Sequence, residues 1–253
     1  ILTFNVQWNL EAEKVKEAKE NLKQVINQEK PDVIALQEPP LKGGPNVKWV
    51  KSAKEWQDIV GDSYTQYHVG NREGMMVFSH NEKLSNVHHT QEKPGAINQN
   101  SGRTVVYRHI QRLDGKKDGV PFTIINNHWE RDIKQDLTKE IVELVRKNLG
   151  ITEDPPNTFW VGDFNLTDNF HKDALQGYYI DTYHEPTFAK KYYDRIVGKT
   201  APTKIERIDN LQSDHYALMA TFDLQSPTAA HIGKPPVPTA LTQEEEEAFQ
   251  MQQ

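Results

Sequence analysis

The hydrophobic and polar positions of the chain follow two different periods along its length. Apolar residues recur at helical spacing over residues 10–29 and again over 133–149, which predicts two amphipathic helices. A shorter helix is expected at 50–60. Brief apolar runs predict strands, beginning with 1–8 (ILTFNVQW) and 32–38 (DVIALQE). Strands and helices therefore alternate, as in an α/β protein.

The remaining strands follow the same reasoning. They are expected at 64–79, 84–90, 103–112, 120–128, 192–197, 204–208 and 216–224, and at the apolar run 159-FWVGD-163. The segment 114-DGKKDG-119 lies between two of them and has the residues of a hairpin turn. The region around 168–191 is expected to be rich in loops.

Length and composition suit one large core. The 253 residues are 36% hydrophobic and 26% charged, which is enough for a single α/β domain. From Ser226 the composition changes, because four prolines and then 244-EEEE-247 follow. We therefore predict one domain over residues 1–225 and a Pro/Glu-rich tail over 226–253.

Charge and cysteine content exclude several kinds of protein. The formal net charge of -6 gives the whole molecule no attraction for nucleic acid, so a polyanion would need a local basic patch. The chain has no cysteine, which excludes disulfides, zinc-thiolate sites and thiol catalysis. No apolar run is long enough to span a bilayer.

The location of the protein in the cell is open at this stage. The chain begins at Ile1, directly on an expected strand and without an initiator methionine. A removed signal peptide would explain this, so secretion is favoured, and the cytosol is also compatible with a cysteine-free chain.

The stretch 159-FWVGDFNLTDN-169 contains the first candidate functional side chains. Strand alternation predicts that Asp163 and Asn165 lie on the same side of the chain at a strand end. Two oxygen-bearing groups there suit a hydrated hard cation or an activated water. An Asx-rich turn that caps the strand is an equally good interpretation of this stretch.

Other polar residues stand at or beside expected strand ends. They are Asn5 in the first strand, Glu38 after DVIALQ, His128 in 123-TIINNHW-129, Asp194 in 192-YYDRIV-197, and Asp214 and His215 in 213-SDHYAL-218. Each alone is more typical of a loop or a structural residue. Because ligands bind where strand-end loops converge, their joint occurrence indicates a functional site.

The order TFN, LQE, NHW, GDFN, SDH resembles the endonuclease/exonuclease/phosphatase superfamily, from about residue 2 to residue 222. Within it, YDRIV is similar to deoxyribonuclease I, and the opening TFNVQWNL is similar to the nuclease subunit of cytolethal distending toxins. The resemblance implies a deoxyribonuclease I-like, four-layer α/β sandwich. Two packed, mainly antiparallel sheets would be flanked by helices, with the site where the loops of the two sheets meet.

The resemblance also implies metal-dependent hydrolysis of a phosphate ester. Glu38 would be the main ligand of Mg²⁺, with Mn²⁺ or Ca²⁺ as alternatives, and Asn5 and Asp214 would complete or support the metal environment. Asp163 would orient or deprotonate the attacking water. Asn165 would hold the phosphate or the water shell of the metal.

Two histidines are expected to face the scissile phosphate. One of His128 and His215 would stabilise charge as an imidazolium, and the other would act as a general acid or base. Each needs a carboxylate partner, which the resemblance assigns as Asp194 for His215 and Glu73 for His128.

Two arginines are candidate phosphate clamps, because a guanidinium can bind phosphate through two hydrogen bonds. Arg103 matches the arginine that opens the corresponding strand in the family, and Arg72 is a weaker match. The alternative for either is a surface salt bridge.

The leading functional hypothesis is a monomeric, Mg²⁺-dependent endonuclease that hydrolyses DNA with little sequence preference. A phosphoinositide or other phosphomonoester phosphatase with the same core is the first alternative. The Tyr-Tyr pair before Asp194 and Phe164 in GDFN favour the nuclease, while the toxin-like resemblance leaves a lipid phosphatase activity open. A catalytically inactive binding module is a further alternative. The sequence identifies no delivery or inhibitor protein.

Overall fold

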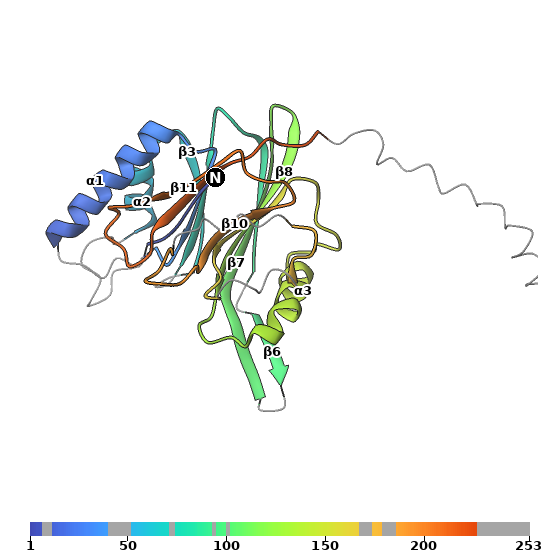
Figure 1. The fold of residues 1–253 in the computed structure, drawn as a ribbon. Coiled ribbons are helices and arrows are strands. Elements are labelled where there is room, and N and C mark those ends of the chain that lie inside the picture. Colours follow the sequence, from blue (N-terminus) through green and yellow to red (C-terminus); the bar gives the residue numbers. More distant parts are fainter. Residues whose placement is uncertain are drawn as a thin grey trace, which may run out of the picture.

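The structure is a computed structural model that describes residues 1–6, 12–39, 52–70, 74–92, 95–99, 102–166, 174–178 and 186–226. It shows two six-stranded sheets packed face to face, with helices on both outer faces (Figure 1). The predicted four-layer α/β sandwich is therefore confirmed. Most of the predicted tail lies outside the described residues.

The first sheet has the strand order β11-β12-β1-β2-β4-β3. Its strands are β1 (Leu2–Asn5), β2 (Val33–Gln37), β3 (Tyr64–Val69), β4 (Met75–His80), β11 (Lys204–Ile208) and β12 (Ala217–Thr221). Strands β1 and β2 are parallel and their neighbours pair antiparallel. The parallel pair places the ends of β1 and β2 at the same edge of the sheet.

The second sheet has the order β10-β9-β8-β7-β5, and a further strand, β6, pairs with β7. Its strands are β5 (Ser85–Glu92), β6 (Gly95–Gln99), β7 (Gly102–Lys117), β8 (Val120–Trp129), β9 (Thr158–Asp163) and β10 (Asp194–Gly198). Strands β8 and β9 are parallel, and the other pairs are antiparallel. The ends of β8 and β9 therefore also meet at one edge.

Helices enclose the two sheets. Helices α1 (Ala12–Glu29) and α2 (Ala53–Val60) pack on the first sheet, and α3 (Thr138–Asn148), after the short 3-10 helix η1 (Gln135–Leu137), packs on the second. Among the described residues, no helix combines the length and apolarity needed to cross a membrane. Three apolar layers result, two under helices and one between the sheets.

Strand alternation divides each strand between two of these layers. In β9, Trp160 packs under α3, whereas Phe159 and Val161 lie in the layer between the sheets. Because successive side chains point to opposite faces, Asp163 takes the same side as Phe159 and Val161. The last residue of β9 therefore lies at the end of the inter-sheet layer.

The predicted hairpin between β7 and β8 is present, but its turn is shorter than the segment 114–119. The strands stay paired as far as Lys117 and Val120. Only Asp118 and Gly119 turn, with φ of 50° and 79°. Two successive positive φ values suit a two-residue turn whose twist matches the strands, so Gly115 of the first Asp-Gly pair remains inside β7.

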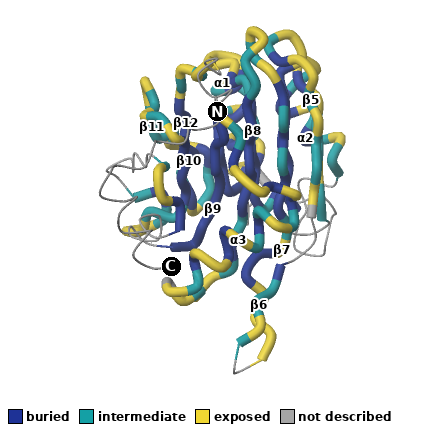
Figure 2. The backbone as a smooth tube through the Cα atoms, turned by 90° about the vertical axis from the view of Figure 1, so that its right-hand side faces the viewer, coloured by how far each residue is buried: buried dark blue, intermediate teal, exposed yellow. Residues whose placement is uncertain are grey.

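Strand β6 was not predicted. It forms a hairpin with the start of β7 that projects from the body of the molecule (Figures 1 and 2). A Cβ at Gly95 would lie 2.1 Å from the ring of Tyr107, so only glycine allows this close approach. The Tyr107 hydroxyl accepts a 2.6 Å hydrogen bond from Asn148 of α3. The base of the hairpin is thus packed against the second sheet and its helix.

Candidate active site

Three strands of the second sheet bring polar side chains together at one edge. In the parallel pair β8–β9, His128 lies opposite Asp163. In the antiparallel pair β9–β10, Asp194 lies opposite Asp163 on the other side. Sheet register alone therefore gives Asp163 a histidine on one flank and a carboxylate on the other.

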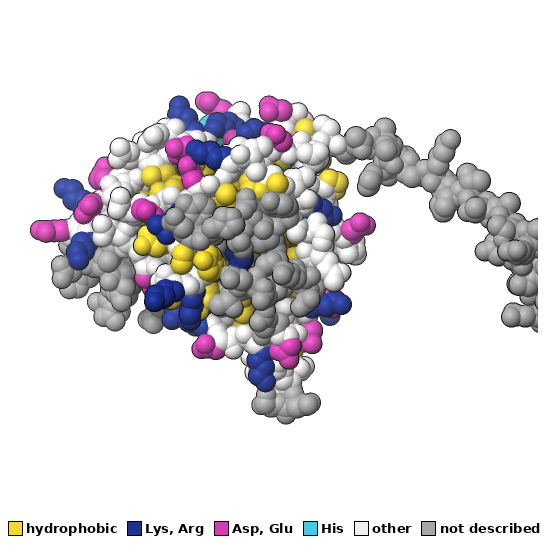
Figure 3. Space-filling view, in the orientation of Figure 1, with side chains coloured by type: hydrophobic (Ala, Val, Ile, Leu, Met, Phe, Trp, Pro, Cys, Tyr) yellow, Lys and Arg dark blue, Asp and Glu magenta, His cyan; other side chains and the backbone are white. Residues whose placement is uncertain are grey.

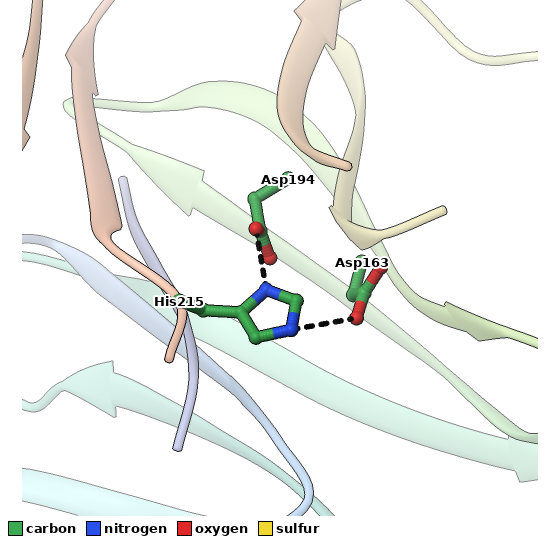
Figure 4. A group of neighbouring side chains, drawn as sticks. All are labelled: Asp163, Asp194 and His215. Atoms are coloured by element: carbon green, nitrogen blue, oxygen red, sulfur yellow. Dashed lines mark hydrogen bonds and ion pairs between the residues drawn. The ribbon is translucent and has the colours of Figure 1, made fainter. Parts of the chain in front are cut away.

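His215 completes this group from the segment just before β12 (Figure 4). Its Nδ1 lies 2.7 Å from Oδ2 of Asp194, and its Nε2 lies 3.7 Å from Oδ2 of Asp163. Burial alone would lower the pKa of His215, but the charge and hydrogen bond of Asp194 outweigh burial and raise that pKa to about 9. The His215 side chain is therefore an imidazolium at neutral pH.

Ser213 ties His215 to the first strand. Its hydroxyl accepts a hydrogen bond from the backbone N–H of His215 at 3.1 Å and donates one to the carbonyl oxygen of Asn5 at 2.9 Å. Ser213 belongs to the SDH motif, but the sequence does not show its role. Its presence in the motif was the available signal, and only the tertiary contact with Asn5 shows its function.

The turn before β10 positions Asp194, the carboxylate partner of His215. The hydroxyl of Thr187 accepts the backbone N–H of Asp194 at 3.0 Å. The ring of Phe188 lies 4.7 Å from the His215 ring, and Tyr193 stacks on Phe188 at 5.4 Å. Sequence analysis missed Thr187 and Phe188, because they fall in a segment without periodic pattern. They fix the orientation of the histidine and of its carboxylate partner.

Asp163 is anchored through both carboxylate oxygens. Oδ2 accepts a 2.8 Å hydrogen bond from the Asn5 carboxamide, and Oδ1 accepts a 2.9 Å hydrogen bond from the backbone N–H of Asn165. Burial and the negative charge of Asp194 raise the pKa of Asp163 to about 7. A fixed carboxyl group with a pKa near neutrality suits proton transfer from water.

Asn165 lies beyond the end of β9, where strand alternation no longer applies. Its φ is 51°, and its carboxamide donates a 2.6 Å hydrogen bond to the carbonyl oxygen of Trp129. The backbone bond from Asn165 to the Asp163 side chain makes an Asx turn. The Asx turn that the sequence also allowed is therefore present, and the Asn165 side chain fastens the β9 loop to the end of β8.

His128 has the opposite electrostatic state from His215. Its Nε2 lies 3.3 Å from Oε1 of Glu38 and 3.9 Å from Oδ2 of Asp163. Burial and the positive charge of His215 lower the pKa of His128 to about 3, and burial raises the pKa of Glu38. The imidazole of His128 is neutral at pH 7, so the site pairs one neutral and one charged histidine around Asp163.

The residues present fit a divalent cation. Asn5 Oδ1 is buried and has no hydrogen-bond partner among the described residues, although Asn5 Nδ2 is bonded to Asp163. Glu38 follows the end of β2, beside the end of β1 that carries Asn5. Burial raises the pKa of Glu38, and the negative charge of Asp214 adds to this rise. Carboxylate and carboxamide oxygens are the ligands that Mg²⁺ prefers. Glu38 and Asn5 Oδ1 would therefore hold the ion, with Asp214 adding negative charge.

A second group of ligand atoms lies beside them. Atoms of Asp163, Asp194 and His215 lie within 4.8 Å of one another. Because His215 Nδ1 is already hydrogen-bonded to Asp194, this group is better described as a histidine held between two carboxylates. Glu38 with Asn5 remains the better-fitting cation site.

The other predicted site residues lie apart or outside the description. Glu73 and Arg72 lie outside the described residues. Arg103 is exposed near the start of β7, four residues before Tyr107, which pairs with Trp129. At about 3.3 Å per residue, this places Arg103 roughly 13 Å along the strand from Trp129. It is thus on the projecting hairpin, and its role as a phosphate clamp stays a prediction.

The fold and this site define a class of phosphoester hydrolase. Residues 2–215 match the family model described as the Endonuclease/Exonuclease/phosphatase family. The chain belongs to this family, whose enzymes hydrolyse phosphoester bonds with the help of a divalent metal ion. No curated protein sequence matches the chain.

Three solved structures illustrate the likeness of this fold to known proteins. An endonuclease/exonuclease/phosphatase family protein from Leptotrichia buccalis C-1013-b is 19% identical with a TM-score of 0.64, covering 88% of this chain and 98% of that one. TDP2 from D. rerio, complexed with single strand DNA product, is 15% identical with a TM-score of 0.61, covering 88% and 97%. The human Nocturnin catalytic domain with bound sulfate anion is 17% identical with a TM-score of 0.60, covering 89% and 93%. At these identities the likeness establishes the fold.

Proposed function

We propose that this protein is a Mg²⁺-dependent endonuclease that hydrolyses DNA with little sequence preference. The observation that carries the proposal is the arrangement around Asp163. A neutral His128 and a charged His215 approach the same carboxylate oxygen at 3.9 and 3.7 Å. Both distances are beyond hydrogen-bond length, so Asp163 does not occupy either Nε2 atom. Glu38 Oε1 lies 3.3 Å from His128 Nε2, so a phosphate bound there would replace this contact.

Each side chain has a defined task in hydrolysis of a phosphodiester. Asp163 takes a proton from the attacking water as the new oxygen–phosphorus bond forms, the bond to the leaving oxygen breaks, and the leaving alkoxide takes a proton from solvent. The imidazolium of His215 stabilises the negative charge on a phosphoryl oxygen. His128 hydrogen-bonds the phosphoryl group without adding a second positive charge. Glu38 and Asn5 would hold a divalent cation, which would supply Lewis-acid neutralisation of that charge.

The choice of DNA as substrate draws on the relatives, whereas the surface charge limits how DNA would bind. The similar TDP2 of D. rerio was solved with single strand DNA product. On the face shown in Figure 3, the basic and acidic side chains of the described residues are interspersed, and the chain carries a net charge of -6. Binding of a polyanion by such a surface depends on a few local contacts, which are sensitive to salt.

The decisive experiment is plasmid nicking with Mg²⁺, with an EDTA control. The double variant His128→Ala/His215→Ala is expected to lose nicking. A matched variant, His68→Ala/His88→Ala, changes two exposed histidines outside the site and is expected to nick normally. Release of phosphate from a soluble phosphoinositide is measured in parallel. Phosphate release without nicking would replace the nuclease by a phosphatase with the same core, and neither activity would indicate a binding module.

The dependence of the hydrolysis rate on salt concentration distinguishes a polymeric substrate from a small one. Nicking is expected to fall about tenfold or more between 50 and 200 mM salt, because DNA binding releases condensed counterions. Hydrolysis of bis(p-nitrophenyl) phosphate, a small diester, is expected to change little over the same range. An equally flat response with plasmid would argue against DNA as the substrate.

A further inference from the structure

A chain of buried side-chain amides crosses the layer between the two sheets. It consists of Gln37 on β2, Asn126 on β8 and Gln111 on β7, each 0% exposed. Gln37 Nε2 donates to Asn126 Oδ1 at 2.8 Å, and Asn126 Nδ2 donates to Gln111 Oε1 at 3.0 Å. We call these three residues the inter-sheet amide chain. It joins the first sheet to the second through directional bonds.

Backbone carbonyl groups fix the direction of every bond in the inter-sheet amide chain. Asn126 Nδ2 lies 3.4 Å from the carbonyl oxygen of Leu36 and 3.3 Å from that of Met76. Because carbonyl oxygens only accept, the amide nitrogen of Asn126 must face them and its oxygen must face Gln37. The orientation of the Asn126 amide is therefore determined by the first sheet.

The same reasoning extends to the outer edge of the layer. Gln111 presents Oε1 to Asn126, so its Nε2 donates to the carbonyl oxygen of Tyr67 at 3.2 Å and to His89 Nε2 at 3.2 Å. At the other end, Gln37 Nε2 donates to the hydroxyl of Thr3 at 3.0 Å. The hydrogen bonds thus run without a break from β1 to the edge strands β3 and β5.

The inter-sheet amide chain lies directly behind the candidate site. Gln37 precedes Glu38 in the sequence, and Asn126 stands two residues before His128 on the same side of β8. Glu38 directly follows β2 of the first sheet and His128 lies on β8 of the second, and their side chains are 3.3 Å apart. The Gln37–Asn126 bond is therefore a short, buried tie between the two backbones that carry this pair.

Apart from the hydrogen bonds at the site itself, such as those from Asn5 to Asp163 and between His215 and Asp194, most contacts of the inter-sheet layer lack such direction. Its buried members are mainly apolar, for example Ala35, Ile124 and Val161. Apolar contacts are non-directional, so they hold the sheets together without fixing their relative position to a fraction of an ångström. Hydrogen bonds between buried amides do fix it, because a small displacement leaves a polar group unpaired.

From this geometry we propose that Gln37 and Asn126 are positioning residues that set the relative placement of Glu38 and His128. They would thereby control both the affinity for the divalent ion and the rate of hydrolysis. The inference rests on the proposed metal-dependent function. Changes to groups that orient metal ligands typically weaken metal affinity or activity by about 10- to 100-fold.

The test uses Gln37→Met and Asn126→Leu, each of which removes the bond and keeps similar volume. Dissociation constants for Mn²⁺ are measured by electron paramagnetic resonance of the free ion, which needs no turnover. Both variants are expected to bind Mn²⁺ at least about tenfold more weakly and to have a lower kcat for plasmid at saturating metal. Folding is checked by urea unfolding.

A matched control separates positioning from stability. Tyr64→Phe removes another buried hydrogen bond, the 2.6 Å bond from the Tyr64 hydroxyl to the carbonyl oxygen of Pro31, at the opposite end of β2. Its urea midpoint should fall much as in Gln37→Met, but its Mn²⁺ affinity and kcat should match the wild type. The double variant Gln37→Leu/Asn126→Leu removes both partners, so its urea midpoint should recover in part while its Mn²⁺ affinity stays weak.

The outcomes distinguish this inference from the proposed function. If the wild-type protein nicks DNA and the amide variants lose stability yet keep full Mn²⁺ affinity and kcat, the inter-sheet amide chain is purely structural and the inference is wrong. If the wild-type protein neither binds Mn²⁺ nor nicks DNA, the proposed function is wrong, and the inference that rests on it is wrong as well. Weak Mn²⁺ binding in both amide variants, against a normal Tyr64→Phe, establishes positioning.

Discussion

The layer between the sheets and the layers under the helices are built by the same strands but differ in chemistry. Under α3, the side chains form an apolar cluster that includes Trp160, Ile141 and Val145, and the buried carboxylate of Asp154 is hydrogen-bonded at its margin. Between the sheets, apolar residues at one end give way to the inter-sheet amide chain and then to the ionisable site. Because successive side chains of a strand point to opposite faces, one strand can serve both layers. Strand β9 contributes Trp160 to the apolar layer under α3 and Asp163 to the site between the sheets.

Within the inter-sheet layer, two histidines show how environment sets chemical state. Both are mostly buried, yet the pKa of His128 falls to about 3 with burial and the charge of His215, whereas Asp194 raises the pKa of His215 to about 9. The difference lies in the partner and not in the residue type. The comparison between layers leads to three predictions, in order of expected effect.

The largest effect is expected at the site end of the inter-sheet layer. Asp194→Asn removes the countercharge of His215, so kcat for plasmid nicking should fall by about 10³-fold, in the range found for disrupted acid–base groups. Because Asp194 also stabilises the buried imidazolium, the free energy of unfolding should fall too, so kcat is measured well below the unfolding transition. Asp114→Asn, which alters a carboxylate paired with Arg112 and Thr123, is the control and should retain activity. A loss of less than tenfold in Asp194→Asn would show that His215 does not act as an imidazolium.

A substitution in a layer under a helix should change the free energy of unfolding and leave activity unchanged. Asp154 accepts hydrogen bonds from Arg146, Tyr178 and Trp160, which lower its pKa although burial opposes ionisation. Asp154→Ala leaves these donors unpaired and should reduce the free energy of unfolding by about 3–5 kcal/mol. The kcat of the folded protein, measured well below the unfolding transition, should be unchanged.

The control for that prediction is an ion pair at the surface. Asp209→Ala breaks the pair of Arg207 with a carboxylate whose side chain is 50% exposed. Its effect on the free energy of unfolding should be below about 1 kcal/mol. Equal losses in Asp154→Ala and Asp209→Ala, or a matching fall in kcat for Asp154→Ala, would remove the distinction between the layers.

The smallest effect is expected at the outer edge of the inter-sheet layer. Burial, with the positive charges of His88 and His68, lowers the pKa of His89 to about 4. The folded-state pKa lies below the unfolded value of about 6.5, so this contribution is fully present above pH 6.5 and is lost as the pH falls toward 4. Because His89 is partly exposed, the contribution should be on the order of 1 kcal/mol.

The measurement for His89 is urea unfolding at pH 7 and pH 5. His89→Gln keeps an acceptor for Gln111 and does not titrate, so its stability should depend less on pH than that of the wild type. Identical pH dependence in the two proteins would mean that His89 is not the group that titrates in this range.

Much of this organisation follows from the sequence. Helical spacing predicted α1 and α3, and apolar runs predicted β1, β2 and β9, because burial of one face imposes a period on the side chains. Polar residues at strand ends indicated one site because strand-end loops converge. The projecting strand β6 was missed, since 95-GAINQ-99 has little apolar alternation and its pairing depends on the close approach of Tyr107 to Gly95.

Only the tertiary structure decided how these pieces act on one another. The sequence identified His128, Asp163 and His215 but not which imidazole is neutral, because that depends on burial and on partners from other strands. It likewise left Gln37 and Asn126 as ordinary strand residues. Local pattern determines the face on which each side chain lies, whereas the packing of one sheet on the other determines what that side chain meets.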